Sequence, residues 1–166
     1  MEPFEKMLFS ITHPARYAGG EWNARVKNWQ ENQVHFAMAF PDIYEIGMSS
    51  LAIPILYDIL NKQPGVLAER VFAPWTDMET AMREGATPLF SLESRRPLRD
   101  FDVIGFSLSY ELAYSNVLNM LDMAGIPVRA KERGDGHPLV IAGGGCCVNP
   151  EPMAEFIDLF VIGEAE

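Results

Sequence analysis

The chain has 166 residues, of which 48% are apolar, and it carries 13 Lys and Arg against 23 Asp and Glu, for a net charge of -10. This length fits a single domain, and the apolar fraction excludes a disordered chain. The acidic balance argues against a free-standing nucleic-acid-binding domain, because phosphate contacts need clustered Lys and Arg. The two cysteines, Cys146 and Cys147, are adjacent and therefore cannot form a disulfide framework.

The N-terminus has neither the basic start nor the long apolar run of a signal peptide, and no apolar stretch reaches the roughly 20 residues that span a bilayer. We therefore expect a cytoplasmic protein without membrane contact. Residues 1–30 are expected to form a short helix from Phe4 to Ile11 and an arm, which Trp22 and Trp29 pin onto a body of residues 31–166.

From residue 34 onward, short apolar runs alternate with helical patterns. The runs predict strands at residues 34–40, 66–73, 102–108, 139–142 and 158–162, with a short extra strand at 89–92. Helices are predicted from a cap at Ser49 or Ser50 to Leu60, over 75–84 and 110–124, and briefly over 152–156. This order predicts a three-layer Rossmann-like, flavodoxin-like α/β fold, with a five-stranded parallel sheet and helices on both faces.

Ligands of such sheets bind beyond the carboxyl ends of the strands, so the loops at residues 41–50, 107–111 and 143–150 are the candidate site. The alternatives are structural: a turn capped by the loop Asp, a Tyr packed on the sheet edge, a Ser that caps the next helix, and glycines that only shape a turn. The candidate ligand-binding residues are Asp42, Tyr44, Gly47, Ser107, Ser109, Gly143, Gly144 and Gly145.

Together these loops resemble the cobalamin (B12)-binding Rossmann-like domain, whose loops carry Asp-x-His-x-x-Gly, Ser-x-Leu and Gly-Gly. Asp42 and Gly47 match the first motif, Ser107 matches the second, and Gly143 and Gly144 match the third. The resemblance implies glycines where the backbone approaches a flat corrin and a hydroxyl that holds the buried nucleotide tail.

The departures from this pattern are Tyr44, where the family has the His that ligates cobalt, and Ser109 in place of Leu. The Asp of the motif normally orients that His, and Asp42 has no imidazole to orient. The resemblance therefore implies cobalamin bound base-off without a His ligand, or a degenerate domain that has lost the cofactor.

Longer strings are similar to the N-terminal region of a family of uncharacterised radical SAM proteins. They lie at residues 14–17, 40–49, 68–75, 88–94 and 149–152. In that family this domain precedes a barrel that binds a [4Fe-4S] cluster on a Cys-x-x-x-Cys-x-x-Cys motif, together with S-adenosylmethionine. The resemblance implies that both cofactors belong to this downstream barrel, that the barrel is the domain's partner, and that the chain is truncated before it.

Two functions follow from the resemblance, a cofactor-binding module and a cofactor-free module that caps the barrel or docks its unknown substrate. A stand-alone receiver or flavodoxin-like domain ranks lower, because Ser107 and Gly163 stand where a receiver has its phosphoacceptor Asp and its Lys. The fragment itself is not expected to be catalytic or to bind a metal, because neither cysteine has a His expected beside it.

The densest basic run is Arg95, Arg96 and Arg99. It is either a docking patch or a solvated turn before the third strand, and the sequence leaves both readings open.

Overall fold

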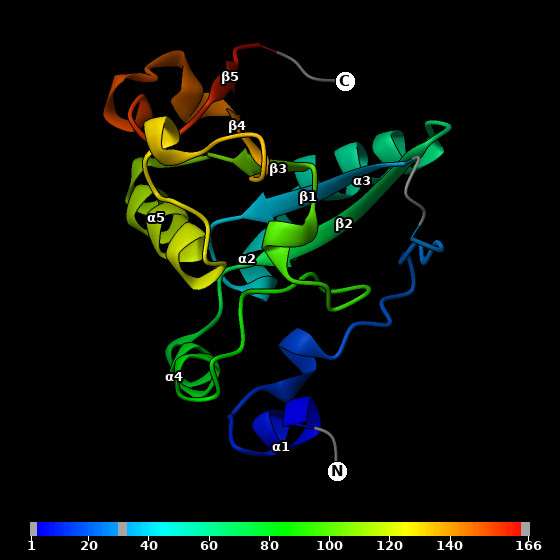
Figure 1. Cartoon of the computed structure of the whole chain (residues 1–166). Helices are drawn as coiled ribbons and strands as arrows, with labels where there is room; N and C mark the ends of the chain where they lie inside the picture. Colours follow the sequence, from blue (N-terminus) through cyan, green and yellow to red (C-terminus); the bar gives the residue numbers. More distant parts are fainter. Residues whose placement is uncertain (1–2, 30–32, 164–166) are drawn as a thin grey trace.

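A computed structural model describes residues 3–29 and 33–163 of the chain. Its centre is a five-stranded parallel sheet with the order β2-β1-β3-β4-β5 (Figure 1). The strands are β1 (Val34–Phe40), β2 (Val66–Phe72), β3 (Val103–Ser107), β4 (Leu139–Gly143) and β5 (Leu159–Val161). The α-helices are α1 (Pro3–Phe9), α2 (Tyr44–Ser49), α3 (Ala52–Lys62), α4 (Thr76–Glu84) and α5 (Tyr114–Met123). The predicted α/β fold with a five-stranded parallel sheet is confirmed.

The two faces of the sheet are covered by different helices, α3 on one side and α5 on the other (Figure 1). Under α3, Met38 of β1 packs with Ile53 and Tyr57. On the opposite face Ile104 of β3 packs with Val117 of α5 in the larger core. Both contacts follow from the alternation of side chains along a strand, which sends neighbouring residues to opposite faces.

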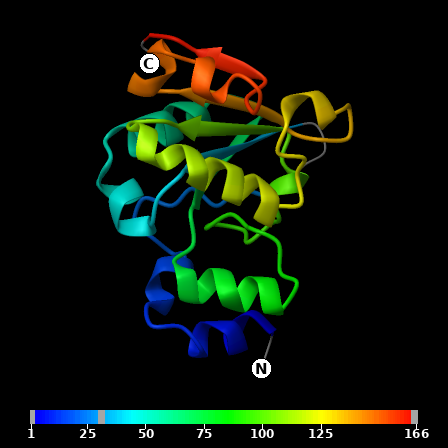
Figure 2. The same cartoon turned by 90° about the vertical axis from the view of Figure 1, so that its left-hand side faces the viewer.

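Helix α4 does not lie flat on the sheet but beside α1, in a lobe below the strands (Figures 1 and 2). Met78 and Met82 of α4 join the larger core. The segment after α1 is tied to the same helix, because Thr12 donates to Asp77 through its backbone N–H at 2.9 Å and its hydroxyl at 2.6 Å. The N-terminal segment is thus held by the crossover between β2 and β3.

The outer edge of β2 is covered around Arg70 by residues 92–94 rather than left open. Leu92 N–H donates to Arg70 O at 2.8 Å, and Arg70 N–H donates to the Glu93 carboxylate at 2.7 Å. Covering the edge in this way removes a free template for pairing with another chain. The predicted strand at 89–92 is wrong, because this segment makes only an isolated antiparallel bridge between Phe90 and Pro97.

Three local predictions also differ from the structure. Residues 44–49 form α2, and α3 begins after Leu51 without a side-chain cap, so the predicted Ser49 or Ser50 cap is wrong. The long helix begins at Tyr114 after a 3-10 turn at Glu111–Ala113, and neither is capped by a side chain. Residues 152–156 hold only part of a 3-10 turn, Glu151–Met153.

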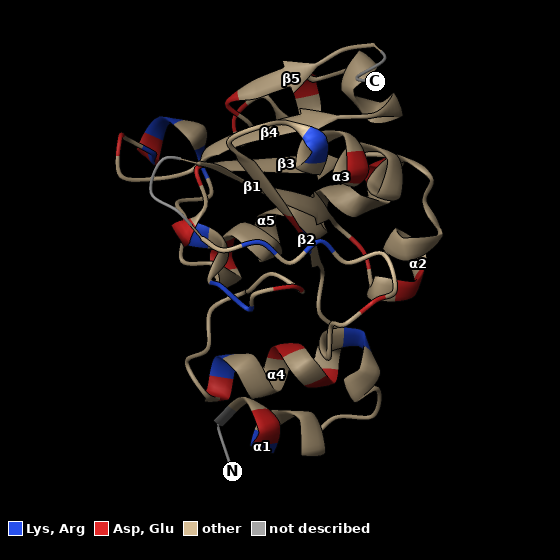
Figure 3. Cartoon of the chain, turned by 90° about the vertical axis from the view of Figure 1, so that its right-hand side faces the viewer, with Lys and Arg blue, Asp and Glu red and all other residues tan. Residues whose placement is uncertain are grey.

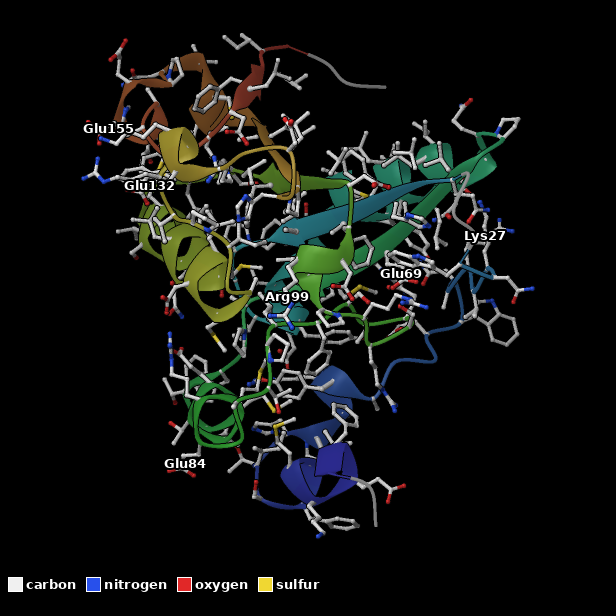
Figure 4. The ribbon with its side chains drawn as sticks, in the orientation of Figure 1. Lys27, Glu69, Glu84, Arg99, Glu132 and Glu155 are labelled. Atoms are coloured by element: carbon white, nitrogen blue, oxygen red, sulfur yellow. The ribbon has the colours of Figure 1, made fainter. Side chains whose placement is uncertain are left out.

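The arm before β1 is attached by one of its two tryptophans. Trp29 stacks on His35 with ring centroids 3.6 Å apart, whereas Trp22 is fully exposed, so the expectation that Trp22 pins the arm is wrong. Lys27 adds a second attachment by donating to Val66 O at 2.9 Å, beside the start of β2 (Figure 4). The expected boundary between arm and body, at residues 30 and 31, lies outside the described residues.

Among the helices of the described residues, none combines the length and the apolar character that crossing a membrane requires.

Candidate functional site

The loops after β1 and β3 are joined through Asp42. The Tyr110 hydroxyl donates to one Asp42 carboxylate oxygen, and the backbone N–H of Ile43 donates to the other at 2.7 Å. Asn116 of α5 adds a bond of 2.8 Å to the Pro41 carbonyl. Asp42 therefore holds the loop after β1 against the loop after β3.

Tyr44 and Gly47 lie in α2 and pack against Phe72 at the end of β2. The Tyr44 ring meets Phe72 edge to face at 5.5 Å, and a Cβ on Gly47 would lie 2.3 Å from the Phe72 ring. Burial raises the pKa of Tyr44, and the nearby Glu21 carboxylate adds to the shift. A close approach within the protein explains the glycine at this position.

Ser107, Gly143 and Gly144 line one groove, which has a volume of about 310 Å³. We call it the α3–β5 groove, because α3 forms one wall and β3, β4 and β5 form its floor. Asp42, Tyr44, Gly47, Ser109 and Gly145 are not among its lining residues. The apolar side chains that line it include Phe36, Leu56, Ile59, Leu60, Ile141 and Val161.

None of the described residues that line the groove carries a charge. Strands β3, β4 and β5 themselves hold no Lys, Arg, Asp or Glu (Figure 3). The groove can thus receive an apolar group, with the Ser107 side chain as one of its few polar features. Its chemistry does not match a ligand that needs charged partners at this place.

The two cysteines lie in the 3-10 turn Gly145–Val148 that follows β4. Cys147 is buried, and burial raises the pKa of its thiol, which is the opposite of what an activated nucleophile needs. Within residues 3–29 and 33–163, no group of three His, Cys, Asp or Glu is placed to hold a metal ion.

The basic run before β3 is used in part to hold the N-terminal segment. The Arg95 guanidinium lies 4.3 Å from the Phe4 ring centroid, and that of Arg96 lies 4.3 Å from Trp29. The Arg99 side chain is exposed and lies on the side of this segment that faces α5 (Figure 4). Two of the three arginines therefore have cation–π partners within the chain.

Sequence reasoning missed the buried ionic cluster on β2. Arg70 is fully buried and donates through Nε to Glu93 at 2.7 Å, while its Nη2 lies 3.4 Å from Glu21. Its guanidinium also lies 4.6 Å from the Tyr57 ring centroid. The only signal was a charged pair, Glu69 and Arg70, inside an otherwise apolar strand.

Replacing Tyr110 by Phe should lower the free energy of unfolding at neutral pH by about 1–2 kcal/mol, because a bond to a carboxylate is lost. Burial and the Asp42 carboxylate raise the pKa of Tyr110 from 10.0 to about 12. A tyrosine with a raised pKa in the folded state stabilises below its unfolded pKa, and this contribution is lost as pH rises through the folded value.

Urea denaturation between pH 9 and 12 checks this expectation. The stability difference between wild type and Tyr110→Phe should shrink across the interval from about 10 to 12. Tyr57, whose pKa burial also raises to about 12, titrates in both proteins and cancels in the difference. A difference that stays constant across the interval contradicts the role given to the Tyr110–Asp42 bond.

Comparison with known proteins gives a family match and a similar protein. The family model described as "Radical SAM proteins, N-terminal" matches residues 52–166. Uncharacterized protein MJ0966 of Methanocaldococcus jannaschii is 26% identical over 131 residues, which cover 78% of this chain and 24% of that protein. The chain thus spans about a quarter of the length of this relative. Because the family model matches well over half of its residues, the chain belongs to the radical SAM proteins and corresponds to their N-terminal region.

Proposed function

We propose that this domain is a docking module, which packs against the catalytic part of a radical SAM protein through the carboxyl edge of its sheet. The observation that carries the proposal is a set of exposed apolar side chains on the loops and short helical elements at that edge. Ile46, Leu51, Leu112 and Val148 are 44%, 77%, 87% and 76% exposed, and we call these four residues the carboxyl-edge platform. Several apolar side chains exposed at one edge of a sheet are typical of an interaction surface.

The platform rests on loops that are bonded to one another. Leu108 N–H donates to Gly143 O at 2.7 Å, and Cys146 N–H donates to Leu108 O at 3.1 Å. Tyr110 and Asp42 join the β1 loop to the β3 loop in the same way. A surface held by such bonds loses little conformational entropy on binding, which favours a stable contact.

In this proposal the iron–sulfur cluster and S-adenosylmethionine, which the family implies for the whole protein, are held by the catalytic part. The role of the present chain is to position and shield that part. Its own contribution is the apolar surface of the carboxyl-edge platform.

The test is a Leu112→Lys/Val148→Lys variant of the full-length protein, followed by hydrogen exchange of the loops after β3 and β4. Burying two lysines in an apolar contact is unfavourable, so these loops should exchange as fast as in the 166-residue chain alone. Val26→Lys is the matched control, because Val26 is 79% exposed on the arm and away from the platform. Equal exchange of these loops in the wild-type full-length protein and in the chain alone would falsify the docking role.

Cobalamin binding is a second candidate, favoured by one observation. Ser107, Gly143 and Gly144, which match two of the three B12-type loops, line a single groove. A nucleotide tail in this groove would meet apolar walls and the Ser107 hydroxyl. Asp42 and Tyr44 do not support a cobalt ligand there, because Tyr110 binds the first and Phe72 packs on the second.

Mixing the full-length protein with hydroxocobalamin, desalting it and recording the visible spectrum tests this candidate. Retention near one equivalent that is lost in Ser107→Tyr but kept in Ser109→Tyr is the supporting result, because Ser107 lines the groove and Ser109 does not. Tyr44→His should leave the spectrum unchanged. Colourless wild-type protein rejects cobalamin and leaves the docking role standing.

A further inference from the structure

One face of the sheet is covered over only part of its width. Helix α3 packs on β1 and β2, whereas on the same face β3, β4 and β5 carry no helix among the described residues. The strand register places Gly105 beside Ile141, and Ile141 beside Leu159, so these residues share that face. Leu139 and Leu159, at the start of their strands, are 47% and 51% exposed. The opposite face of β3 and β4 is closed by α5.

The wall beside this open face is also apolar. Leu56, Ile59 and Leu60 of α3 line the α3–β5 groove, and none of its described lining residues is charged. Such a surface matches an apolar stripe on a helix, because helices cover parallel sheets by burying one stripe of side chains.

We propose that an amphipathic helix, formed by the polypeptide that follows β5 in the full-length protein, fills the α3–β5 groove. Gly163, directly after β5, is itself one of the groove's lining residues, so the chain leaves β5 at the groove. The family model describes an N-terminal region, and the Methanocaldococcus relative is about four times as long as the part matched, so that relative has polypeptide of the length that this helix needs.

The dimensions of the open face set the length of this helix. A strand of five residues such as β4 spans about 17 Å at ~3.3 Å per residue. A helix rises ~1.5 Å per residue, so about 11 residues, or three turns, cover the same distance. The helix should therefore be short, with apolar residues three and four apart against Ile59 and Ile141, and with its charges turned to solvent.

This surface differs from the carboxyl-edge platform, so the two proposals can fail separately. Cysteine probes at Ile59→Cys, in the groove, and Leu112→Cys, on the platform, distinguish them. Val26→Cys on the arm is the control for both. Each is introduced into the full-length protein, into the 166-residue chain, and into a chain extended by roughly 25 residues, enough for a short turn and a three-turn helix. The rate of alkylation at each position is read by peptide mass spectrometry, which separates the probes from Cys146 and Cys147.

We expect alkylation at Ile59→Cys to slow at least ~10-fold in both the extended chain and the full-length protein, relative to the 166-residue chain, because burial protects a thiol. Leu112→Cys should slow only in the full-length protein, and Val26→Cys in none. Hydrogen exchange of the added segment should show protection over about three turns.

Four results would contradict the proposal that a helix fills the groove. Ile59→Cys that reacts at one rate in all three proteins leaves the groove open. If Ile59→Cys is protected only in the full-length protein, the catalytic part fills the groove. If its protection requires added hydroxocobalamin, a cofactor fills the groove. If its protection rises with protein concentration, a second copy of the chain fills the groove. None of these results alters the Leu112→Cys readout, which tests the docking role alone.

Discussion

Replacing Arg70 by Leu is expected to lower the free energy of unfolding by about 3–5 kcal/mol, the typical cost of removing one partner from a buried ion pair. The Arg70 side chain is fully buried, and it binds Glu93 while Glu21 and the Tyr57 ring lie beside it. Without the guanidinium, the Glu93 carboxylate stays buried with no cation. Urea denaturation of the wild type and the variant at pH 8 measures the loss.

The pH dependence of this loss identifies its cause. Burial raises the pKa of Glu93, and the Arg70 charge opposes that shift, so the pKa should rise further in Arg70→Leu. A carboxyl whose pKa is raised by folding stabilises the protein at low pH, and this contribution is lost as pH rises through the folded pKa. The stability gap between variant and wild type should therefore be smaller at pH 5.5 than at pH 8.

Two further variants complete this test. Arg83→Leu is the matched control: the Arg83 side chain is 47% exposed, and its pairs with Glu79 and Asp122 lie at the surface, where loss costs less than ~1 kcal/mol. Arg70→Leu/Glu93→Gln should recover part of the loss, because a neutral amide is cheaper to bury than a carboxylate. An Arg70→Leu variant no less stable than Arg83→Leu would contradict the role given to this cluster.

The cluster also shows where sequence reasoning reaches its limit. The order and type of the main strands and helices were predictable, because apolar runs of strand length alternate with amphipathic helices from residue 34 onward. The partners of Arg70 were not, because Glu21 and Glu93 lie 49 and 23 residues away in the chain. Only the fold brings the arm, β2 and the segment after α4 to one point.

The candidate site was also predicted only in part. All eight predicted residues lie in the loops or short elements at the carboxyl ends of β1, β3 and β4, because in a parallel sheet those ends share one edge. Helix α2 affects which of these residues share a surface, and its six residues were predicted to be part of a loop. Helix α2 turns Tyr44 and Gly47 towards Phe72. Of the eight predicted residues, Ser107, Gly143 and Gly144 line the groove.

Replacing Gly144 by Ala is expected to cost roughly 3 kcal/mol, from backbone strain and a steric clash together. Gly144 has φ +107°, a conformation that side chains disfavour, and an added Cβ would lie 2.7 Å from the Leu108 carbonyl oxygen. That oxygen already accepts the Cys146 N–H at 3.1 Å, so moving it away breaks a hydrogen bond of the same loop. The loop therefore cannot relieve the clash by moving this carbonyl without losing a hydrogen bond.

Gly145→Ala provides the matched control one residue further along. An added Cβ at Gly145 meets no atom within 4 Å, and its φ is not in the positive region, so the change should stay within about ±0.5 kcal/mol. Thermal or urea denaturation of the two variants, without any ligand, measures the contrast. Equal stability of Gly144→Ala and Gly145→Ala would show that the loop can accommodate the added methyl group. Gly144 would then remain a candidate ligand-binding residue. The expected contrast instead makes Gly144 a structural residue that fixes the loop carrying Val148 of the platform and the rim of the groove.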